Sequence, residues 1–137
     1  MSERILDHIG IAVPSLDDAI PIWTSLVDAP ATGREAVEAQ GVEVVFLGSG
    51  SGRVELLAPT GPASPVARFL EKRGPGLHHV CYRVADLEAA LAELRAEGFE
   101  LIDQVPRRGA HDHRIAFLHP RTSTGALVEL IESTEVQ

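Results

Sequence analysis

Two histidines and two glutamates, each in a stretch of otherwise apolar residues typical of a β-strand, are the strongest candidates for chemistry in this sequence. They are His8, Glu55, His79 and Glu129. Imidazole nitrogens and carboxylate oxygens together suit a borderline divalent cation such as Co, Zn, Mn, Ni or Fe, whereas Ca and Mg prefer shells of oxygen alone. An unpaired carboxylate is costly to bury, and a bound cation would remove that cost. The four residues therefore predict a metal site.

An internal repeat relates the members of this set. The strand-like segment at 7–13 (DHIGIAV) matches the segment at 78–84 (HHVCYRV) when the sequence is shifted by 71 residues. Equivalent places in a repeat indicate one shared site. The same shift pairs His8 with His79, Leu16 with Leu87, and Phe46 with Phe117. A shift three residues longer pairs Glu55 with Glu129.

Hydrophobic periodicity and turn residues divide each half into a strand, a helix and three further strands. In the first half, we expect strands at 5–13, 35–39, 42–47 and 53–59, and a helix at 16–27 capped by Ser15. In the second half, we expect strands at 77–84, 99–105, 115–118 and 126–131, and a helix at 87–97 capped by Asp86. Between the halves, Ser64 and Pro65 begin a short helix that ends before the glycines at 74 and 76. The glycine-rich segment at 48–52 is interpreted as a hairpin loop and not as a phosphate-binding loop, because a strand follows it.

These elements predict an α+β fold in which the whole chain, 1–137, is a single domain. Two βαβββ modules, at about 1–60 and 76–137, are joined by a short helical linker. One such module leaves a face of its sheet open, and pairing two modules buries apolar surface while leaving a shared cleft. We therefore expect a cupped, mixed sheet that draws metal ligands from both modules.

The composition bears on partners and on cellular location. Twenty acidic and twelve basic side chains give a formal net charge of −8, which disfavours nonspecific binding to nucleic acid or to an anionic membrane. The N-terminus lacks the pattern of a signal peptide, and no apolar run approaches membrane-spanning length. The single cysteine, Cys81, leaves no pair for a disulfide framework. A cytoplasmic protein with a small-molecule partner is expected.

The remaining histidines carry weaker predictions. His78 directly precedes His79, so the alternation of a strand should turn it to the opposite face. His111 and His113 lie in or beside a polar loop at 107–112 and are expected to be exposed, and His119 is expected to help end a strand before a proline. Any one of the four candidate ligands, taken alone, fits a hydrogen-bonded core histidine or a solvent-facing strand glutamate. Their internal symmetry favours the metal site.

Taken together, these features resemble the vicinal oxygen chelate superfamily of glyoxalases, bleomycin resistance proteins and dioxygenases. Within it, several segments are similar to the methylmalonyl-CoA epimerases. They cover essentially the whole chain, and their order is specific although no single one would be. In chain order they are DHIGIAV at 7–13, VELLAP at 54–59, SP with FL at 64–70, GLHHV at 76–80, GAH at 109–111, FLHP at 117–120 and GALVEL at 125–130.

This resemblance implies a homodimeric isomerase that inverts the α-carbon of methylmalonyl-CoA or a close acyl-CoA. The implied chemistry is proton abstraction through a metal-stabilised enolate, with a divalent ion (Co, Zn, Mn, Ni or similar) on His8, His79 and Glu129 and with Glu55 as a fourth ligand. Inversion requires an acid on one face of the carbon and a base on the other. Glu129 is the first candidate for one role, and Glu55 is a candidate for the second.

The sequence departs from the epimerase pattern in two places. Val44 stands where some epimerases carry a glutamate, and Glu43, one residue away, should point to the opposite face. Either Glu55 is the second base, or a bulge brings in Glu43, or the substrate differs. Asp112 adds a negative charge to a loop that usually has a small residue there. Side chains that would meet CoA phosphates or remain solvated are Lys72, Arg107, Arg108 and Arg121.

Other functions within the superfamily remain open at this point. A glyoxalase-type lyase would act on a thiol adduct, and a dioxygenase would hold Fe(II) with two histidines and one carboxylate, leaving three positions open. Four protein ligands favour proton transfer over oxygen activation. A non-enzymatic, ligand-sequestering dimer is the third alternative, and the presence of all four candidate ligands speaks against it.

Overall fold

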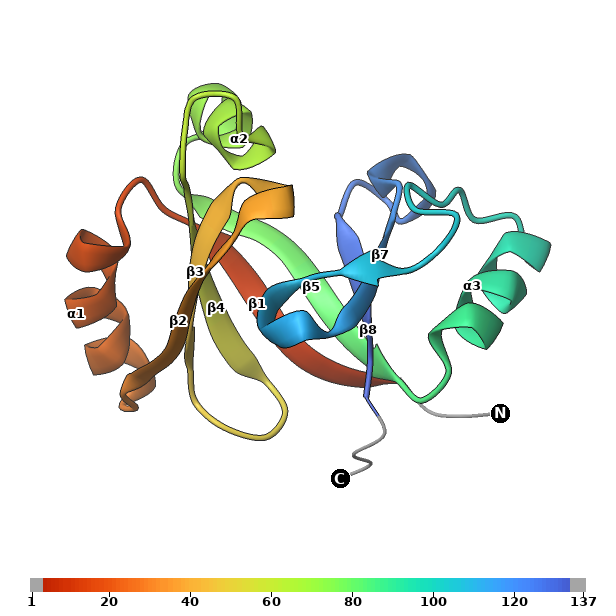
Figure 1. The fold of residues 1–137 in the computed structure, drawn as a ribbon, viewed down its shortest axis with the longest axis horizontal. Helices are drawn as coiled ribbons and strands as arrows, with labels where there is room; N and C mark the ends of the chain where they lie inside the picture. The colour runs from red at the N-terminus through yellow and green to blue at the C-terminus, as the bar shows by residue number, and fades with distance from the viewer. Residues whose placement is uncertain (1–3, 134–137) are drawn as a thin grey trace.

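The computed structural model describes residues 4–133, and within this range the chain forms one curled sheet with helices on its outside (Figure 1). The strands are β1 (Ile5–Ala12), β2 (Ala31–Val37), β3 (Val42–Leu47), β4 (Arg53–Pro59), β5 (Gly76–Val84), β6 (Arg107–Arg108), β7 (Arg114–Leu118) and β8 (Val128–Glu132). The α-helices are α1 (Leu16–Val27), α2 (Pro65–Arg73) and α3 (Leu87–Ala96), and short 3-10 helices are η1 (Glu38–Gln40), η2 (Ala110–Asp112) and η3 (Pro120–Thr122).

The sheet has the strand order β2-β3-β4-β1-β5-β8-β7-β6. At its centre β1 and β5 pair antiparallel, while β1 pairs parallel with β4 and β5 pairs parallel with β8. Reading outward from the centre, each half therefore repeats the same order of strands. This arrangement confirms the predicted α+β class and the mixed sheet.

The helices begin where the sequence supplies a cap. The Ser15 side chain accepts a hydrogen bond from the Asp18 N–H, and the Asp86 side chain accepts one from the Ala89 N–H. α1 packs on β3 and β4, and α3 packs on β7 and β8, so each half has its own apolar core under its helix. Among residues 4–133, none of the helices combines the length and the apolar character needed to span a bilayer.

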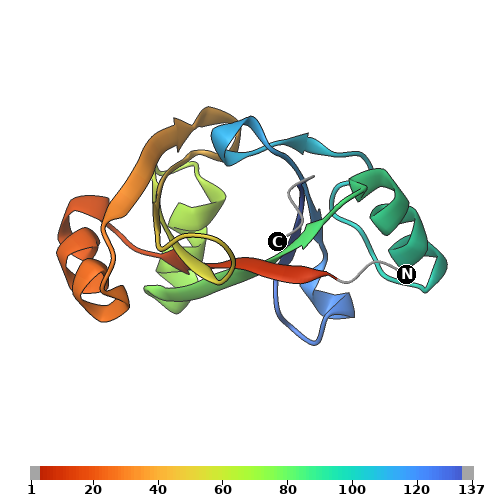
Figure 2. The ribbon, with the colours of Figure 1, turned by 90° about the horizontal axis from the view of Figure 1, so that it is seen from below.

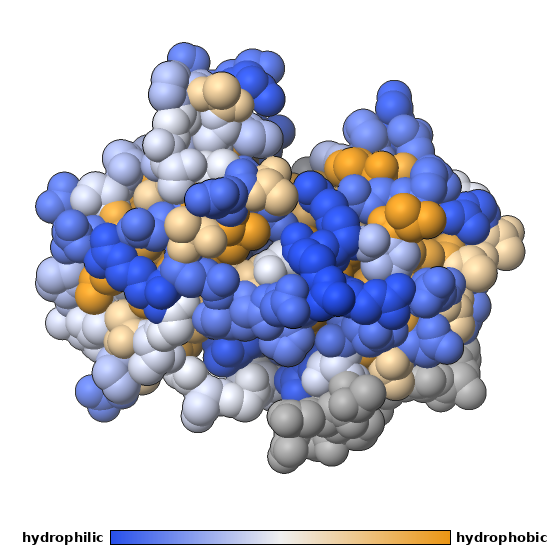
Figure 3. Space-filling model, viewed as in Figure 1, coloured by the Kyte–Doolittle hydropathy of each residue, from blue (hydrophilic) through white to orange (hydrophobic). Residues whose placement is uncertain are grey.

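The sheet curls until its two edge regions meet (Figure 2). Glu35 of β2 accepts a hydrogen bond from the His111 N–H at 2.7 Å, and its carboxylate lies 3.0 Å from His111 Nε2. The same His111 nitrogen lies 3.0 Å from the carbonyl oxygen of Gly33. On the face shown in Figure 3, hydrophilic side chains cover the middle of the molecule and apolar patches flank them. The curl encloses the concave face of the sheet.

The predicted strand at 99–105 is wrong. Among residues 4–133, the only β-pairing of this segment is an isolated bridge between Leu101 and Leu118. The Asp103 side chain accepts the hydrogen bond of the Phe117 N–H at 2.9 Å, a bond that a neighbouring strand would otherwise supply. The edge strand β6 forms later instead, at Arg107–Arg108, inside the segment that was predicted to be a loop.

The predicted edge strand at 35–39 is displaced toward the N-terminus. β2 already begins at Ala31, and a register shift between Thr32 and Glu35 takes up Gly33, whose φ of 68° lies in the left-handed region. The chain then leaves the sheet as η1 before β3 begins. Gly33 therefore lies in a bulge within a strand.

Candidate metal centre and active-site pocket

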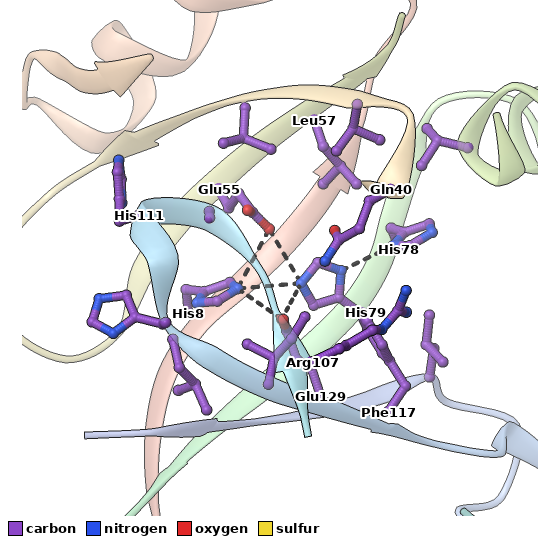
Figure 4. A pocket seen from close by; sticks show the side chains of 18 of the residues that line it. His8, Gln40, Glu55, Leu57, His78, His79, Arg107, His111, Phe117 and Glu129 are labelled. Carbon is purple, nitrogen blue, oxygen red and sulfur yellow. Dashed lines mark hydrogen bonds and ion pairs between the residues drawn. The ribbon is translucent and has the colours of Figure 1, made fainter. Parts of the chain in front are cut away.

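The four predicted ligands converge on one point inside the curled sheet (Figure 4). His8 Nε2 lies 3.2 Å from His79 Nε2. Oε1 of Glu55 lies 3.4 Å and 3.2 Å from these two nitrogens, and Oε1 of Glu129 lies 3.3 Å and 3.1 Å from them. All four residues are buried, with exposed fractions between 3% and 7%. The structure thus brings together every residue of the set.

The strand registers explain this convergence. Across the central β1–β5 pair, His8 lies opposite Cys81 and Gly10 lies opposite His79. Along the parallel pairs, Gly10 lies beside Glu55 in one half and Cys81 lies beside Glu129 in the other. Gly10 and Cys81 are equivalent at the shift of 71 residues. The repeat therefore places one histidine and one glutamate from each half around the same axis.

The spacing of the donor atoms fits one metal ion. Ligands about 2.1 Å from a metal lie about 3.0 Å apart at right angles and about 3.4 Å apart at tetrahedral angles. The five donor-to-donor distances, from 3.1 to 3.4 Å, fall within this range. Donor atoms of His8, His79 and Glu129 alone already form a buried group able to hold a cation.

Hydrogen bonds behind the imidazoles aim their Nε2 atoms at this centre. His8 Nδ1 lies 2.7 Å from Oδ2 of Asp7, whose pKa is raised by burial but lowered overall by His8 and Arg53, so Nδ1 carries the proton. His79 Nδ1 lies 2.9 Å from Nδ1 of His78 and donates to it when His78 is the acceptor. Two Nε2 lone pairs would then face each other beside two carboxylates. Protons or a cation must occupy such a centre.

In the metal-free protein, protons balance the charges. Burial lowers the pKa of His79, but the hydrogen bonds and charges of Glu129 and Glu55 raise it to about 9. Burial also lowers the pKa of His8, yet its bond with Asp7 raises it far above 6.5. Burial raises the pKa of Glu129, whereas His79 and His8 hold it below 4.5 overall. Two imidazolium groups thus face two carboxylates, and one divalent cation can replace the two protons without a change in total charge.

His78 does not face away from the site as predicted. The register of β5 against β1 shifts between His79 and Leu77, which makes His78 the extra residue of a β-bulge. His78 therefore lines the same pocket as His79, and its ring packs edge-on against Phe69 of α2 at 4.9 Å. Burial and then the charge of His79 lower the pKa of His78 to about 4, so it is neutral near pH 7. Strict alternation could not have revealed this bulge.

The pocket around the ligands has a volume of about 280 Å³ and mixed walls. Phe46 and Phe117, equivalent in the repeat, place their rings 5.4 Å from His8 and 6.1 Å from His79. Val44 lines the pocket, and β3 pairs with β4 in continuous register from Val42 to Leu47. Glu43 consequently points outward, as predicted, where Arg34 binds its carboxylate at 2.7 Å. The bulge that would bring Glu43 inward does not occur in this pairing.

The other residues singled out by the sequence divide between the pocket and the surface, and His111 and His113 are exposed, as predicted. Arg107, His111 and His113 line the pocket, whereas Arg108 pairs with Asp112 at 3.0 Å on the surface. The Asp112 charge is thus neutralised by its neighbour in the same loop. Arg121 pairs with Glu100 at 2.9 Å. Cys81 is a free, buried thiol, and burial raises its pKa well above 9.0, so it stays protonated and is a poor nucleophile.

Comparison with known proteins identifies the superfamily of this chain. The sequence profile of the Glyoxalase/Bleomycin resistance protein/Dioxygenase superfamily matches residues 7–117. The chain belongs to this superfamily. Protein YqjC of Bacillus subtilis, whose function is uncharacterized, is 44% identical over 127 residues, which span 93% of this chain and 91% of that protein. The ethylmalonyl-CoA/methylmalonyl-CoA epimerase of Cereibacter sphaeroides is 39% identical, over 91% of this chain and 95% of its own.

A solved structure extends the similarity to three dimensions. A substituted form of the Streptomyces coelicolor methylmalonyl-CoA epimerase, in complex with 2-nitronate-propionyl-CoA, superposes with a TM-score of 0.92 at 35% identity, covering 99% of each chain. Homology to the methylmalonyl-CoA epimerases over most of the chain confirms the expected resemblance and identifies an isomerase-type enzyme of the superfamily.

Proposed function

We propose that this enzyme epimerises methylmalonyl-CoA, or a close acyl-CoA, at the carbon between its thioester and its carboxylate. The observation that carries the proposal is the convergence of His8, Glu55, His79 and Glu129 in one buried pocket. The two epimerases named above act on such thioesters, as their names state, and they support the same substrate class here. In this proposal the acyl group occupies the pocket of about 280 Å³ beside the candidate ligands, and the CoA portion extends outward.

A divalent cation would be held by His8, His79 and Glu129, with Glu55 as a fourth ligand. The donor set of two imidazoles and two carboxylates and the spacing of its atoms both fit such an ion. When bound, the ion supplies a Lewis acid that favours negative charge developing on the thioester oxygen.

Glu129 and Glu55 are the proposed acid and base. A carboxylate has two oxygens, and one of them remains available for proton transfer when the other is a ligand. The two residues come from β8 and β4, in opposite halves of the sheet, so they approach the centre from different sides. Inversion needs a proton removed from one face of the carbon and returned to the other. The outward ion pair of Glu43 with Arg34 favours Glu55 over Glu43 as the second group.

Exchange of the substrate's α-proton tests this proposal directly. We expect methylmalonyl-CoA incubated with the metal-loaded enzyme in deuterated water to gain one deuterium at the α-position, measured by mass spectrometry. Protein stripped by a chelator should lose the exchange and regain it with Co²⁺ or Zn²⁺. Absence of exchange above background in the metal-loaded protein would refute the proposed chemistry.

Two further measurements separate the alternatives. Oxygen uptake with a catechol by the Fe(II)-loaded protein would indicate a dioxygenase. Less than about half an equivalent of transition metal per chain in the purified protein would favour a ligand-sequestering protein, because its binding site needs no stoichiometric ion. Assembly as a homodimer and location in the cytoplasm stay predictions, and light scattering after gel filtration tests the first of them.

A further inference from the structure

Gln40 places a side-chain amide in the pocket without a partner in the protein. Its Nε2 is buried and has no hydrogen-bond partner among residues 4–133. Gln40 lines the pocket that contains the candidate ligands, and its amide points toward His79 in Figure 4. Burying an amide donor without a partner costs free energy, since the amide gives up its hydrogen bonds to water. A ligand in the pocket can restore that bond.

The backbone of Gln40 is held firmly. It ends η1, and the following Gly41 has φ of 66°, in the left-handed region. The Gly41 N–H donates to the Glu38 carbonyl at 3.0 Å, and its carbonyl accepts from the Thr60 N–H at 2.9 Å. On either side of η1, Val37 and Val42 are buried in the same apolar cluster. The amide is therefore presented from a fixed support, as a recognition group requires.

The charges of the pocket indicate what such a donor would meet. A methylmalonyl group enters with a free carboxylate, and the pocket already holds Glu55 and Glu129. Two arginines line it as well: Arg53 binds Asp7 at 3.0 Å through Nη2 while its buried Nε has no partner among residues 4–133, and Arg107 binds Asp103 at 3.3 Å. Hydrogen bonds to ionised acceptors are stronger than those to neutral ones. A carboxylate oxygen is thus the acyl-group atom that gains most from the Gln40 amide.

We propose that the Gln40 amide donates a hydrogen bond to the free carboxylate of the substrate and so selects α-carboxy acyl thioesters. Gln40 is then a specificity-determining residue, distinct from the ligands and from the proton-transferring groups. The inference rests on the proposed function, because it assumes an acyl-CoA substrate in this pocket.

Two thioesters that differ only in the carboxylate provide the test. Isobutyryl-CoA carries a methyl group where methylmalonyl-CoA carries the carboxylate, and an epimerase returns methylmalonyl-CoA chemically unchanged at equilibrium, so calorimetry gives a dissociation constant for both. In the Co²⁺-loaded protein, Gln40→Leu should weaken methylmalonyl-CoA binding about 10- to 100-fold and leave isobutyryl-CoA binding within about twofold. Gln40→Glu should weaken the binding of methylmalonyl-CoA further, because the introduced carboxylate would repel the carboxylate of the substrate.

Gln104→Leu is the matched control. It makes the same substitution at a glutamine whose amide bonds to Leu101 and Arg95 outside the pocket. It should leave both dissociation constants unchanged. An equal loss for both thioesters in Gln40→Leu, or no loss for either, would overturn the role of Gln40. If the unsubstituted protein binds neither thioester, the proposed function fails as well, whereas a carboxylate preference that survives Gln40→Leu defeats the specificity role alone.

Discussion

The two histidine strands are equivalent in the repeat, yet different groups stand behind their imidazoles. In β1 the group is the carboxylate of Asp7, which Arg53 also binds at 3.0 Å. In β5 the equivalent position is His78, a neutral imidazole that also lines the pocket. Asp7 and His78 are each the extra residue of a β-bulge, since the pairing of β1 with β5 shifts in register at each of them. His8 is therefore fixed by a charged group, whereas His79 is held by a weaker bond to a neutral ring that lines the pocket.

The space around the two imidazoles differs as well. A side chain at Gly10 would put its Cβ 2.1 Å from His79 Cε1, so this ring occupies room that only glycine leaves. At the equivalent place beside His8 stands Cys81, a buried thiol. A duplicated module can thus keep its ligands while each copy adapts its neighbours. We expect the β1 half to anchor the metal and the β5 half to adjust to the substrate.

The largest effect on activity is expected from substituting the glutamate that each half contributes to the site. Glu129→Gln should lower the rate of α-proton exchange about 10²- to 10⁴-fold, because it removes a proton acceptor. Glu55→Gln should cause a similar loss if Glu55 is the partner base. Deuterium incorporation at matched metal content measures both. An unimpaired Glu55→Gln would restrict Glu55 to metal binding and break the functional equivalence of the halves.

Gly10→Ala comes next. The methyl group would displace the His79 ring, so metal affinity should fall at least about tenfold, as expected when a ligand loses its geometry. Cys81→Ala, at the equivalent position, removes atoms instead of adding them and should keep most of the affinity, with a stability loss of about 1 kcal/mol. Competition with a fluorescent chelator measures the affinities. Similar metal affinities in the two variants would contradict the idea that His79 has less room beside it than His8.

Substitutions of the two groups behind the imidazoles should differ in their effect on metal affinity, because one group is charged and the other is neutral. Asp7→Asn should weaken metal binding about 10- to 100-fold, because a neutral amide supports the His8 proton less well. His78→Phe keeps a ring against Phe69 and should weaken it less, by under about tenfold. Titration of the chelated protein with Co²⁺ gives both constants. A larger loss in His78→Phe would reverse the assignment of anchor and adjustable half.

The metal-free protein should lose stability as the pH rises. The folded pKa of His79, about 9, exceeds the ordinary 6.5, so its contribution is complete below pH 6.5 and is lost as the pH passes 9. This contribution is on the order of 3 kcal/mol. Chemical denaturation in the presence of a chelator at pH 6 and pH 9.5 measures it. Equal stability at both values would show that protons do not balance the carboxylates.

Glu43→Gln should have the smallest effect. Its carboxylate pairs with Arg34 on the outside of the sheet, and an exposed ion pair contributes less than about 1 kcal/mol. Exchange activity and metal affinity should both match those of the unsubstituted protein. A loss of exchange comparable with that of Glu129→Gln would restore Glu43 as a base and would require β3 to rearrange.

The convergence of the four candidate ligands was predictable because the repeat is visible in the sequence. Strong hydrophobic patterns gave the correct helices α1 and α3 and the central strands, and the shift of 71 residues paired the histidines without any coordinates. The segment at 99–105 was not predictable, since the Asp103 side chain takes the place of a backbone partner. His78 was also misplaced, because a bulge changes the direction of a side chain without changing the residue pattern. The module boundaries at about 1–60 and 76–137 stay a prediction.

The sequence by itself determined which residues are candidate metal ligands and that they lie on equivalent strands of two halves, because residue types and periodicity are visible without coordinates. Tertiary structure alone decided the distances of 3.1 to 3.4 Å between their donor atoms, the direction of His78 and the position of the Gln40 amide. These depend on strand register, on bulges and on the curl of the whole sheet. Such features arise from contacts between segments far apart in the chain, which no single stretch of sequence encodes.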